Sequence, residues 1–172
     1  MKFYWSWLIR RIHYWGTTII IVPLIIVIFT GILLQFKKHS SWVQPKTMKG
    51  QGEKPTISFD YILEIAKNVR ETEIKNWHDI DRVDVRPENG VIKIRAKNRW
   101  ELQIDLQTGE VLQVAYRRSD LIESIHDGSF FHDKVKLWLF FPMAIVLFFL
   151  WLSGIYLFVF PFLKKNNLKI KS

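Results

Sequence analysis

The sequence of 172 residues contains no cysteine, which excludes disulfide bonds, thiol redox chemistry and cysteine metal sites. Acidic residues are also missing from long stretches, because all 16 Asp and Glu lie within residues 37–133. That segment holds 16 of the 25 Lys and Arg, so the whole formal charge of +9 lies outside it. A nucleic-acid-binding protein needs its basic patch on the folded domain. The charge distribution therefore argues against nucleic-acid binding.

Charged residues are absent from two long apolar runs, residues 14–36 and 137–163. A hydrocarbon core roughly 30 Å thick requires about 20 apolar helical residues, so both runs predict transmembrane helices in contact with lipid. A cleavable signal peptide fits the first run poorly. The run is too long, and it ends in QFKKHSSW rather than in small residues that a signal peptidase would cleave.

Basic residues without acidic neighbours occupy the two ends of the chain, the interfacial N-terminus at 1–13 and the tail at 164–172. Positive residues beside the spans mark the cytoplasmic side of a membrane, whereas long loops cross largely regardless of their charge. We therefore expect an inner (cytoplasmic) membrane protein with two spans and both termini in the cytoplasm. The intervening segment then faces the periplasm or the equivalent space.

The segment between the spans begins with residues 37–56, whose prolines and glycines predict a linker. Residues 57–133 form the predicted domain. Ser58 is a plausible N-cap of a helix whose apolar residues recur at helical spacing on one face: Phe59, Ile62, Ala66 and Val69. A short helix at 119–127, capped by Ser119, is expected to end the domain.

Between these helices, apolar residues alternate at period two around the turns PENG, KNR and QTGE. The alternating sets are Val83 and Val85; Ile92, Ile94 and Ala96; Trp100, Leu102, Ile104 and Leu106; and Leu112, Val114 and Tyr116. This pattern predicts an antiparallel meander with one buried face, covered by the helix at 59–69. Asp105 is interpreted as shaping the last turn rather than performing acid–base chemistry.

Several motifs resemble those of a known family. The segment WELQIDLQTGEVLQV resembles the second half of a PepSY domain, with Asp105, Thr108, Gly109 and Val111 at its motif positions. IHYWG (one residue shorter than the family pattern), TGILL, IHDGSFF and LSGIYL resemble, in this order, motifs of PepSY-associated transmembrane proteins. The resemblance covers nearly the whole chain. It implies an α+β extracytoplasmic PepSY-like domain, with a helix packed on an antiparallel meander, between two transmembrane α-helices.

The resemblance also has implications for function. A PepSY domain carries no known catalytic residues, which favours a non-catalytic binding, regulatory or accessory module over an enzyme. Larger relatives with four spans include haem-binding reductases of ferric siderophores, in which histidines in or beside the spans ligate haem. His13 and His126 stand at the family's histidine positions. The alternative is therefore a haem-binding redox subunit for ferric-siderophore reduction or iron uptake, although one copy of this chain lacks a four-helix scaffold.

Helix length limits how the five histidines can combine. A helix of 23 residues separates its ends by roughly 34 Å, so His13 and His126 of one chain cannot share one haem iron. His126 has His39, His132 or a second copy on its side of the membrane, whereas His13 requires a second copy or a partner. The partner is then an envelope protein or another copy of the chain. His39, His78 and His132 are interpreted as surface residues, and no metal-finger spacing is present.

Small residues mark a further position in each span. Thr30 with Gly31, and Ser153 with Gly154, are sites where the two helices can approach closely.

Overall fold

The computed structural model of the chain describes residues 2–169. Of the basic tail predicted at 164–172, residues 170–172 therefore lie outside the described part. The chain divides into two compact units: a membrane unit of residues 1–31 and 124–172, and a unit of residues 32–123. The second unit is termed the outer domain after the side of the membrane that the sequence predicts for it.

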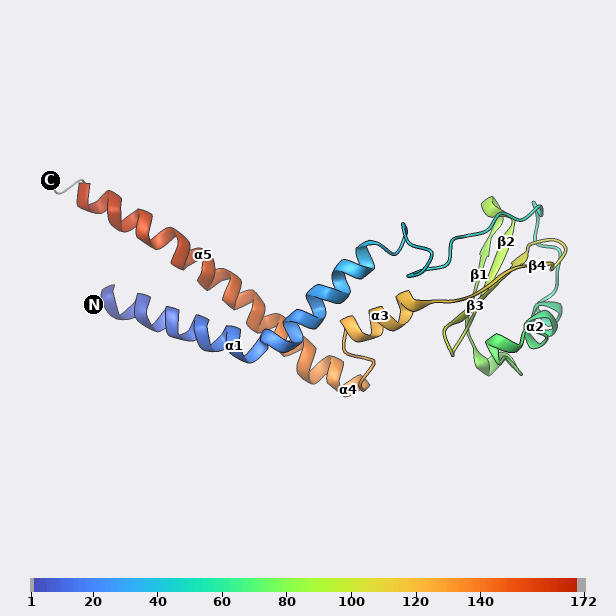
Figure 1. The fold of residues 1–172 in the computed structure, drawn as a ribbon, viewed down its shortest axis with the longest axis horizontal. Coiled ribbons are helices and arrows are strands. Elements are labelled where there is room, and N and C mark those ends of the chain that lie inside the picture. The colour runs from blue at the N-terminus through green and yellow to red at the C-terminus, as the bar shows by residue number, and fades with distance from the viewer. Residues whose placement is uncertain (1, 170–172) are drawn as a thin grey trace. The chain divides into compact units, whose positions relative to one another are not determined.

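The membrane unit is built from two long helices (Figure 1). The first is α1 (Lys2–Gln35), and the second is a continuous run of α4 (Asp133–Val135), the π-helical η4 (Lys136–Phe140) and α5 (Phe141–Lys169). Trp5–Gln35 and Lys136–Pro161 are long and apolar enough to cross a membrane, and only 11% of the apolar window of each is buried within the protein. The remaining apolar surface is thus available to lipid or to other membrane helices.

Both helices contain proline, and each accommodates it differently. Figure 1 shows that α1 bends along its length; Pro23, which lies inside this helix, removes one backbone N–H donor. In the second helix the N–H of Phe141 bonds to the carbonyl of Lys136, which makes a π turn immediately before Pro142. A wider turn at this position accommodates the residue that cannot donate an ordinary helical hydrogen bond.

Apolar side chains join the two helices of the membrane unit. Ile20 of α1 is buried with Phe140 of η4 and with Met143 and Leu150 of α5. Gly16 leaves room for the Leu150 side chain, because a Cβ at this glycine would meet Leu150 Cδ2 at 2.9 Å. The first half of α1 therefore lies against η4 and the first half of α5, and the two helices are antiparallel.

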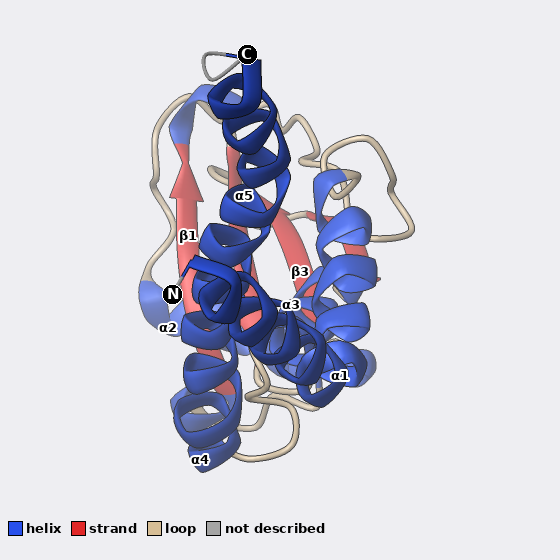
Figure 2. Ribbon diagram, turned by 90° about the vertical axis from the view of Figure 1, so that its left-hand side faces the viewer, coloured by secondary structure: helices blue, strands red, loops and turns tan. Residues whose placement is uncertain are grey.

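The outer domain contains a four-stranded antiparallel sheet in the order β1-β2-β3-β4, which confirms the predicted meander. Its strands are β1 (Ile80–Arg86), β2 (Val91–Ala96), β3 (Trp100–Asp105) and β4 (Val111–Tyr116), drawn in red in Figure 2. Its helices are α2 (Phe59–Lys67) and the short 3-10 turns η1 (Arg70–Thr72), η2 (Trp77–Asp79) and η3 (Pro87–Asn89). α3 (Arg118–His126) follows β4 and leads into the membrane unit.

One face of the sheet forms the apolar core with α2. The buried residues are Ile62, Ala66, Ile74, Ile92, Ile94, Ala96, Leu102, Ile104 and Leu106. Ser58 caps α2 as predicted, since its hydroxyl accepts the N–H of Tyr61 at 3.2 Å. Ser119 does not cap α3, because that helix begins at Arg118 and Ser119 lies in its first turn.

Two residues that the periodicity placed on the buried face are exposed. Phe59 is 65% exposed because it is the first residue of α2, where it contacts Trp77 instead of the sheet. Val85 is 42% exposed because it lies on β1, which is an edge strand. Hydrophobic spacing identifies a face, but it does not show where the neighbouring elements end.

The prediction of a single buried face was wrong, because the opposite face of the sheet is also covered. Residues 46–52, here termed the covering segment, bond to β3 through side chains rather than by strand pairing. The Gln103 amide donates to the carbonyl of Lys46 at 2.9 Å and accepts the N–H of Met48 at 2.8 Å. Asp105 accepts the N–H groups of Gln51 and Gly52. This segment lies within the range that its composition marks as a linker.

Charged side chains are buried on this covered face. Glu101 is fully buried and accepts a hydrogen bond from Arg117 at 2.6 Å and another from Gln103 at 2.8 Å. Lys93, 2% exposed, approaches the same carboxylate at 3.5 Å, as does Arg95. Burial lowers the pKa of Lys93, and the nearby Glu101 carboxylate opposes that shift. One buried carboxylate thus pairs with the buried Lys93 and Arg117 at the centre of the sheet, and Asp120 supplies a second carboxylate to Arg117.

Candidate functional site

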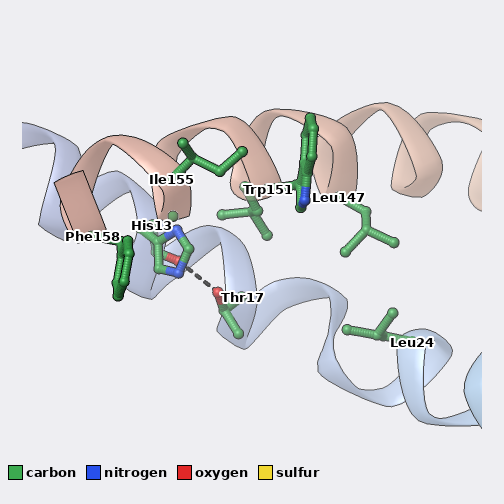
Figure 3. Close-up of a pocket in the computed structure, with 9 residues that line it drawn as sticks. His13, Thr17, Leu24, Leu147, Trp151, Ile155 and Phe158 are labelled. Atoms are coloured by element: carbon green, nitrogen blue, oxygen red, sulfur yellow. Dashed lines mark hydrogen bonds between the residues drawn. The ribbon is translucent and has the colours of Figure 1, made fainter.

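His13 lies on α1 and contacts the small-residue pair of α5. Its Nδ1 is 2.8 Å from the Ser153 hydroxyl, and its Cε1 lies 3.6 Å from the position that a Cβ of Gly154 would occupy. The ring is half-buried and borders an apolar groove of about 490 Å³ between α1 and α5 (Figure 3). Apart from His13 and Thr17, the groove is lined by apolar residues and a glycine: Leu24, Leu147, Leu150, Trp151, Gly154, Ile155 and Phe158.

His126, the last residue of α3, makes the equivalent contact with α1. Its Nδ1 is 2.9 Å from the Thr30 hydroxyl, and its Cε1 lies 3.4 Å from the position of a Cβ on Gly31. This ring is also half-buried. The two histidines that the family motifs singled out therefore each rest on a hydroxyl–glycine pair of the other helix segment.

A compact turn after His126 fixes the direction in which the chain enters the second helix. Asp127 accepts hydrogen bonds from Ser129 at 2.6 Å and from Lys136 at 2.5 Å. Burial opposes the charge of Asp127, but these bonds outweigh it, so the pKa of this carboxyl lies below its usual value. Gly128 has φ +81°, and the Phe140 ring packs against its Cα, where no side chain would fit.

The remaining histidines are exposed, in agreement with their interpretation as surface residues. His132 caps α4, where its Nδ1 accepts the N–H of Lys134 at 3.0 Å. His39 and His78 are exposed in the outer domain. Among the described residues, no group of three or more His, Asp or Glu side chains could hold a metal ion.

Asp105 has the structural role predicted for it. Besides the covering segment, it binds the turn between β3 and β4 by accepting the N–H groups of Gln107 at 2.8 Å and Thr108 at 2.9 Å. The backbone N–H bonds of Thr108 and Gln107, followed by those of Gln51 and Gly52, hold the pKa of this carboxyl far below its usual value despite its burial. A fully bonded carboxylate with a strongly lowered pKa stays ionised near neutral pH and is unsuited to proton transfer there.

The outer domain presents an exposed aromatic pair. Phe59 and Trp77 are 65% and 40% exposed, and their ring centroids are 6.1 Å apart in an edge-to-face arrangement. The turn that carries Trp77 is held by Asp79, which accepts the N–H groups of Lys75 and Asn76 at 2.9 and 3.0 Å. These two bonds also lower the pKa of Asp79. The periodicity had assigned Phe59 to the core, so sequence reasoning missed this surface.

An α+β domain carried between two apolar helices defines a membrane protein with two spans and one extramembrane domain. The family model described as "PepSY-associated TM region" matches residues 10–171, and the chain therefore belongs to this family. No curated protein and no solved structure matches the chain.

Proposed function

We propose that the chain is a non-catalytic binding subunit of the bacterial cytoplasmic membrane. Both termini lie in the cytoplasm, the two spans anchor the outer domain, and this domain binds another envelope protein through Phe59 and Trp77. The exposed aromatic pair is the observation that carries the proposal. Large aromatic side chains are enriched in the contact surfaces of proteins, where they supply much of the apolar area that binding buries.

The surroundings of the pair support a role in recognition. Asp79 and the Asn76 cap fix the backbone on both sides of Trp77, so that little conformational entropy is lost when a partner binds. An open polar hollow lies beside the same turn, lined by Arg70, Glu71, Glu73, Lys75, Asp79 and Trp100. A rigid aromatic pair next to mixed charges fits a folded protein partner with an apolar patch and a polar rim.

The test places a photo-crosslinking amino acid at single positions of the full-length chain in its native membrane. Positions 59 and 77 are expected to give the same defined adduct. Tyr61 is the matched control, because it is an aromatic residue of α2 with similar exposure, 46%, that contacts the turn at Gly109. Absence of adducts at 59 and 77, or equal adducts at all three positions, would refute the proposal.

A second candidate function, a haem-binding redox subunit for iron uptake, is favoured by the groove beside His13. The residues present fit a haem in part: His13 would supply one imidazole ligand, and a glycine with apolar and aromatic side chains would line the site. Among the described lining residues there is one histidine. A bis-histidine iron would therefore take its second ligand from another copy or a partner. When bound, haem would supply one-electron transfer.

The absorption spectrum of the detergent-purified full chain, prepared from haem-supplied cells, tests this candidate. A Soret band that is weakened or lost in His13→Ala or in His126→Ala, and unchanged in His132→Ala, is the expected result. His132 is a suitable control because it is exposed and lies outside the helix contacts. A colourless preparation would eliminate the haem candidate and leave the first proposal untouched.

A further inference from the structure

The two halves of the membrane unit repeat one sequence pattern. Ile12-His13 is followed by Thr30-Gly31-Ile32-Leu33-Leu34, and Ile125-His126 is followed by Ser153-Gly154-Ile155-Tyr156-Leu157. Each half thus contains an Ile-His pair and then a hydroxyl residue, Gly, Ile, any residue and Leu. The residues that recur are those that the contacts must explain.

The structure pairs the two halves crosswise. His13 of the first half contacts Ser153 and Gly154 of the second, and His126 of the second half contacts Thr30 and Gly31 of the first. Because the helices are antiparallel, this exchange relates the halves as an inverted repeat, an arrangement also found in membrane transporters, where ligand sites lie at the interface between the repeats.

The protons of the two hydroxyl groups are already committed. Ser153 Oγ donates to the carbonyl of Leu150 at 2.8 Å, and Thr30 Oγ1 donates to the carbonyl of Ile26 at 2.6 Å. A hydroxyl group has one proton, so toward the imidazole it can only accept. Nδ1 must therefore be the donor in both contacts, and in a neutral imidazole Nε2 then carries a lone pair.

We infer that Ser153 and Thr30 are positioning residues, which hold His13 and His126 as Nδ1–H imidazoles with Nε2 available to a proton or a metal centre. In the described part of the chain, the Nδ1 contact is the hydrogen bond that each ring makes. A partner on the other ring nitrogen commonly orients histidines that bind metal. That the metal centre would be a haem rests on the second candidate function. The inferred Nδ1–H tautomer does not depend on that proposal.

The inference includes the distance between the two sites. Thr30 lies 17 positions after His13 on α1, which corresponds to roughly 25 Å along a helix. The two Nε2 atoms therefore serve separate ligands near opposite ends of the helix pair. This geometry agrees with the expectation that the two histidines of one chain cannot share an iron.

Nitrogen-15 NMR of the histidine-labelled, haem-free full chain in detergent tests the inference. The spectra are recorded at about pH 8, above the ordinary histidine pKa, and assigned with His→Ala variants. His13 and His126 are expected as Nδ1–H tautomers. Ser153→Ala should abolish that signature at His13 alone, and Thr30→Val should abolish it at His126 alone. The conservative variants Ser153→Thr and Thr30→Ser should retain it.

Two internal controls separate positioning from folding. In each variant the histidine of the other site reports whether the helix pair is intact. Thr18→Val removes a hydroxyl of α1 that donates to the carbonyl of Tyr14 and, among the described residues, makes no hydrogen bond to a histidine, so it should change neither ring. An Nε2–H tautomer in the unsubstituted chain, or an unchanged tautomer in Ser153→Ala and Thr30→Val with the helix pair intact, would overturn the inference. A colourless protein with both Nδ1–H signatures would reject haem and support the inference.

Discussion

Replacing Asp105 with Asn is expected to release the covering segment from the sheet, although the two side chains have nearly the same shape. One carboxylate oxygen accepts the N–H groups of Gln107 and Thr108, and the other accepts those of Gln51 at 2.6 Å and Gly52 at 3.1 Å. An Asn side chain keeps one oxygen and places an NH₂ group where the other was. Two donors then face two donors on one side of the residue.

The size of the effect follows from the number of hydrogen bonds lost. Hydrogen bonds to a charged group contribute about 1.5–3 kcal/mol each, so the loss of two corresponds to about 3–6 kcal/mol of the free energy of unfolding. A typical domain has about 5–15 kcal/mol in total. Because Asp105 is only 3% exposed, water can replace the missing acceptor only if the covering segment moves away.

Hydrogen exchange of the full chain in detergent, followed by mass spectrometry, measures this loss within the outer domain. Peptides from the covering segment and β3 should exchange much faster in Asp105→Asn. Glu110→Gln is the matched control: it removes the same charge beside the same turn, but its side chain is exposed, and it should change stability by less than about 0.5 kcal/mol. Unchanged exchange in β3, or equal acceleration in both variants, would show that the carboxylate does not hold the segment.

Three further predictions concern the acid stability of the chain, the buried Glu101 and the turn at Gly128. The lowered pKa of Asp105 means that its stabilisation is complete above about pH 4 and declines as the pH falls from there toward that lowered pKa. Acid titration should therefore show a larger loss of stability in the unsubstituted chain than in Asp105→Asn, and equal losses would contradict this. Glu101→Gln should lower the free energy of unfolding of the outer domain by about 3–5 kcal/mol, because buried cations including Arg117 lose this counter-charge. Hydrogen exchange in the strands that changed only slightly would contradict this. Gly128→Ala should lower the thermal midpoint of the membrane unit, because the backbone has φ +81° and the Phe140 ring fills the space of the new methyl; an unaltered midpoint would refute the contact.

The proposals concern different units of the molecule and can fail separately. Partner binding through Phe59 and Trp77 involves the outer domain, whereas haem binding and the histidine tautomers involve the membrane helices. Loss of adducts at the aromatic pair with intact tautomers would leave the membrane unit as the functional part. The opposite result would assign the histidines a purely structural role in joining the helices.

Periodicity and composition were sufficient to predict the two long helices, the four strands and α2 of this protein. Two uncharged runs specify long apolar helices, because no soluble surface can be built from them. Alternating residues such as Ile92 and Ile94 specify a strand, and Ser58 specifies where α2 begins. These are local properties, since each depends on residues a few positions apart. The sequence motifs also identified the residues of the membrane contacts, although not their partners.

Only the tertiary structure decided which of these residues meet. Ser153 is 140 positions from His13 in the chain. No local sequence pattern indicates that the Ser153 hydroxyl contacts the His13 ring, rather than serving only as a small residue where the two helices approach closely. The covering segment likewise forms hydrogen bonds with Gln103 and Asp105 of β3, side chains that the alternating pattern assigns to solvent. The sequence could not show these bonds, because the partners lie more than 50 positions apart. Secondary structure follows from neighbours in sequence, whereas the proton position on His13 and the burial of Glu101 depend on neighbours in space.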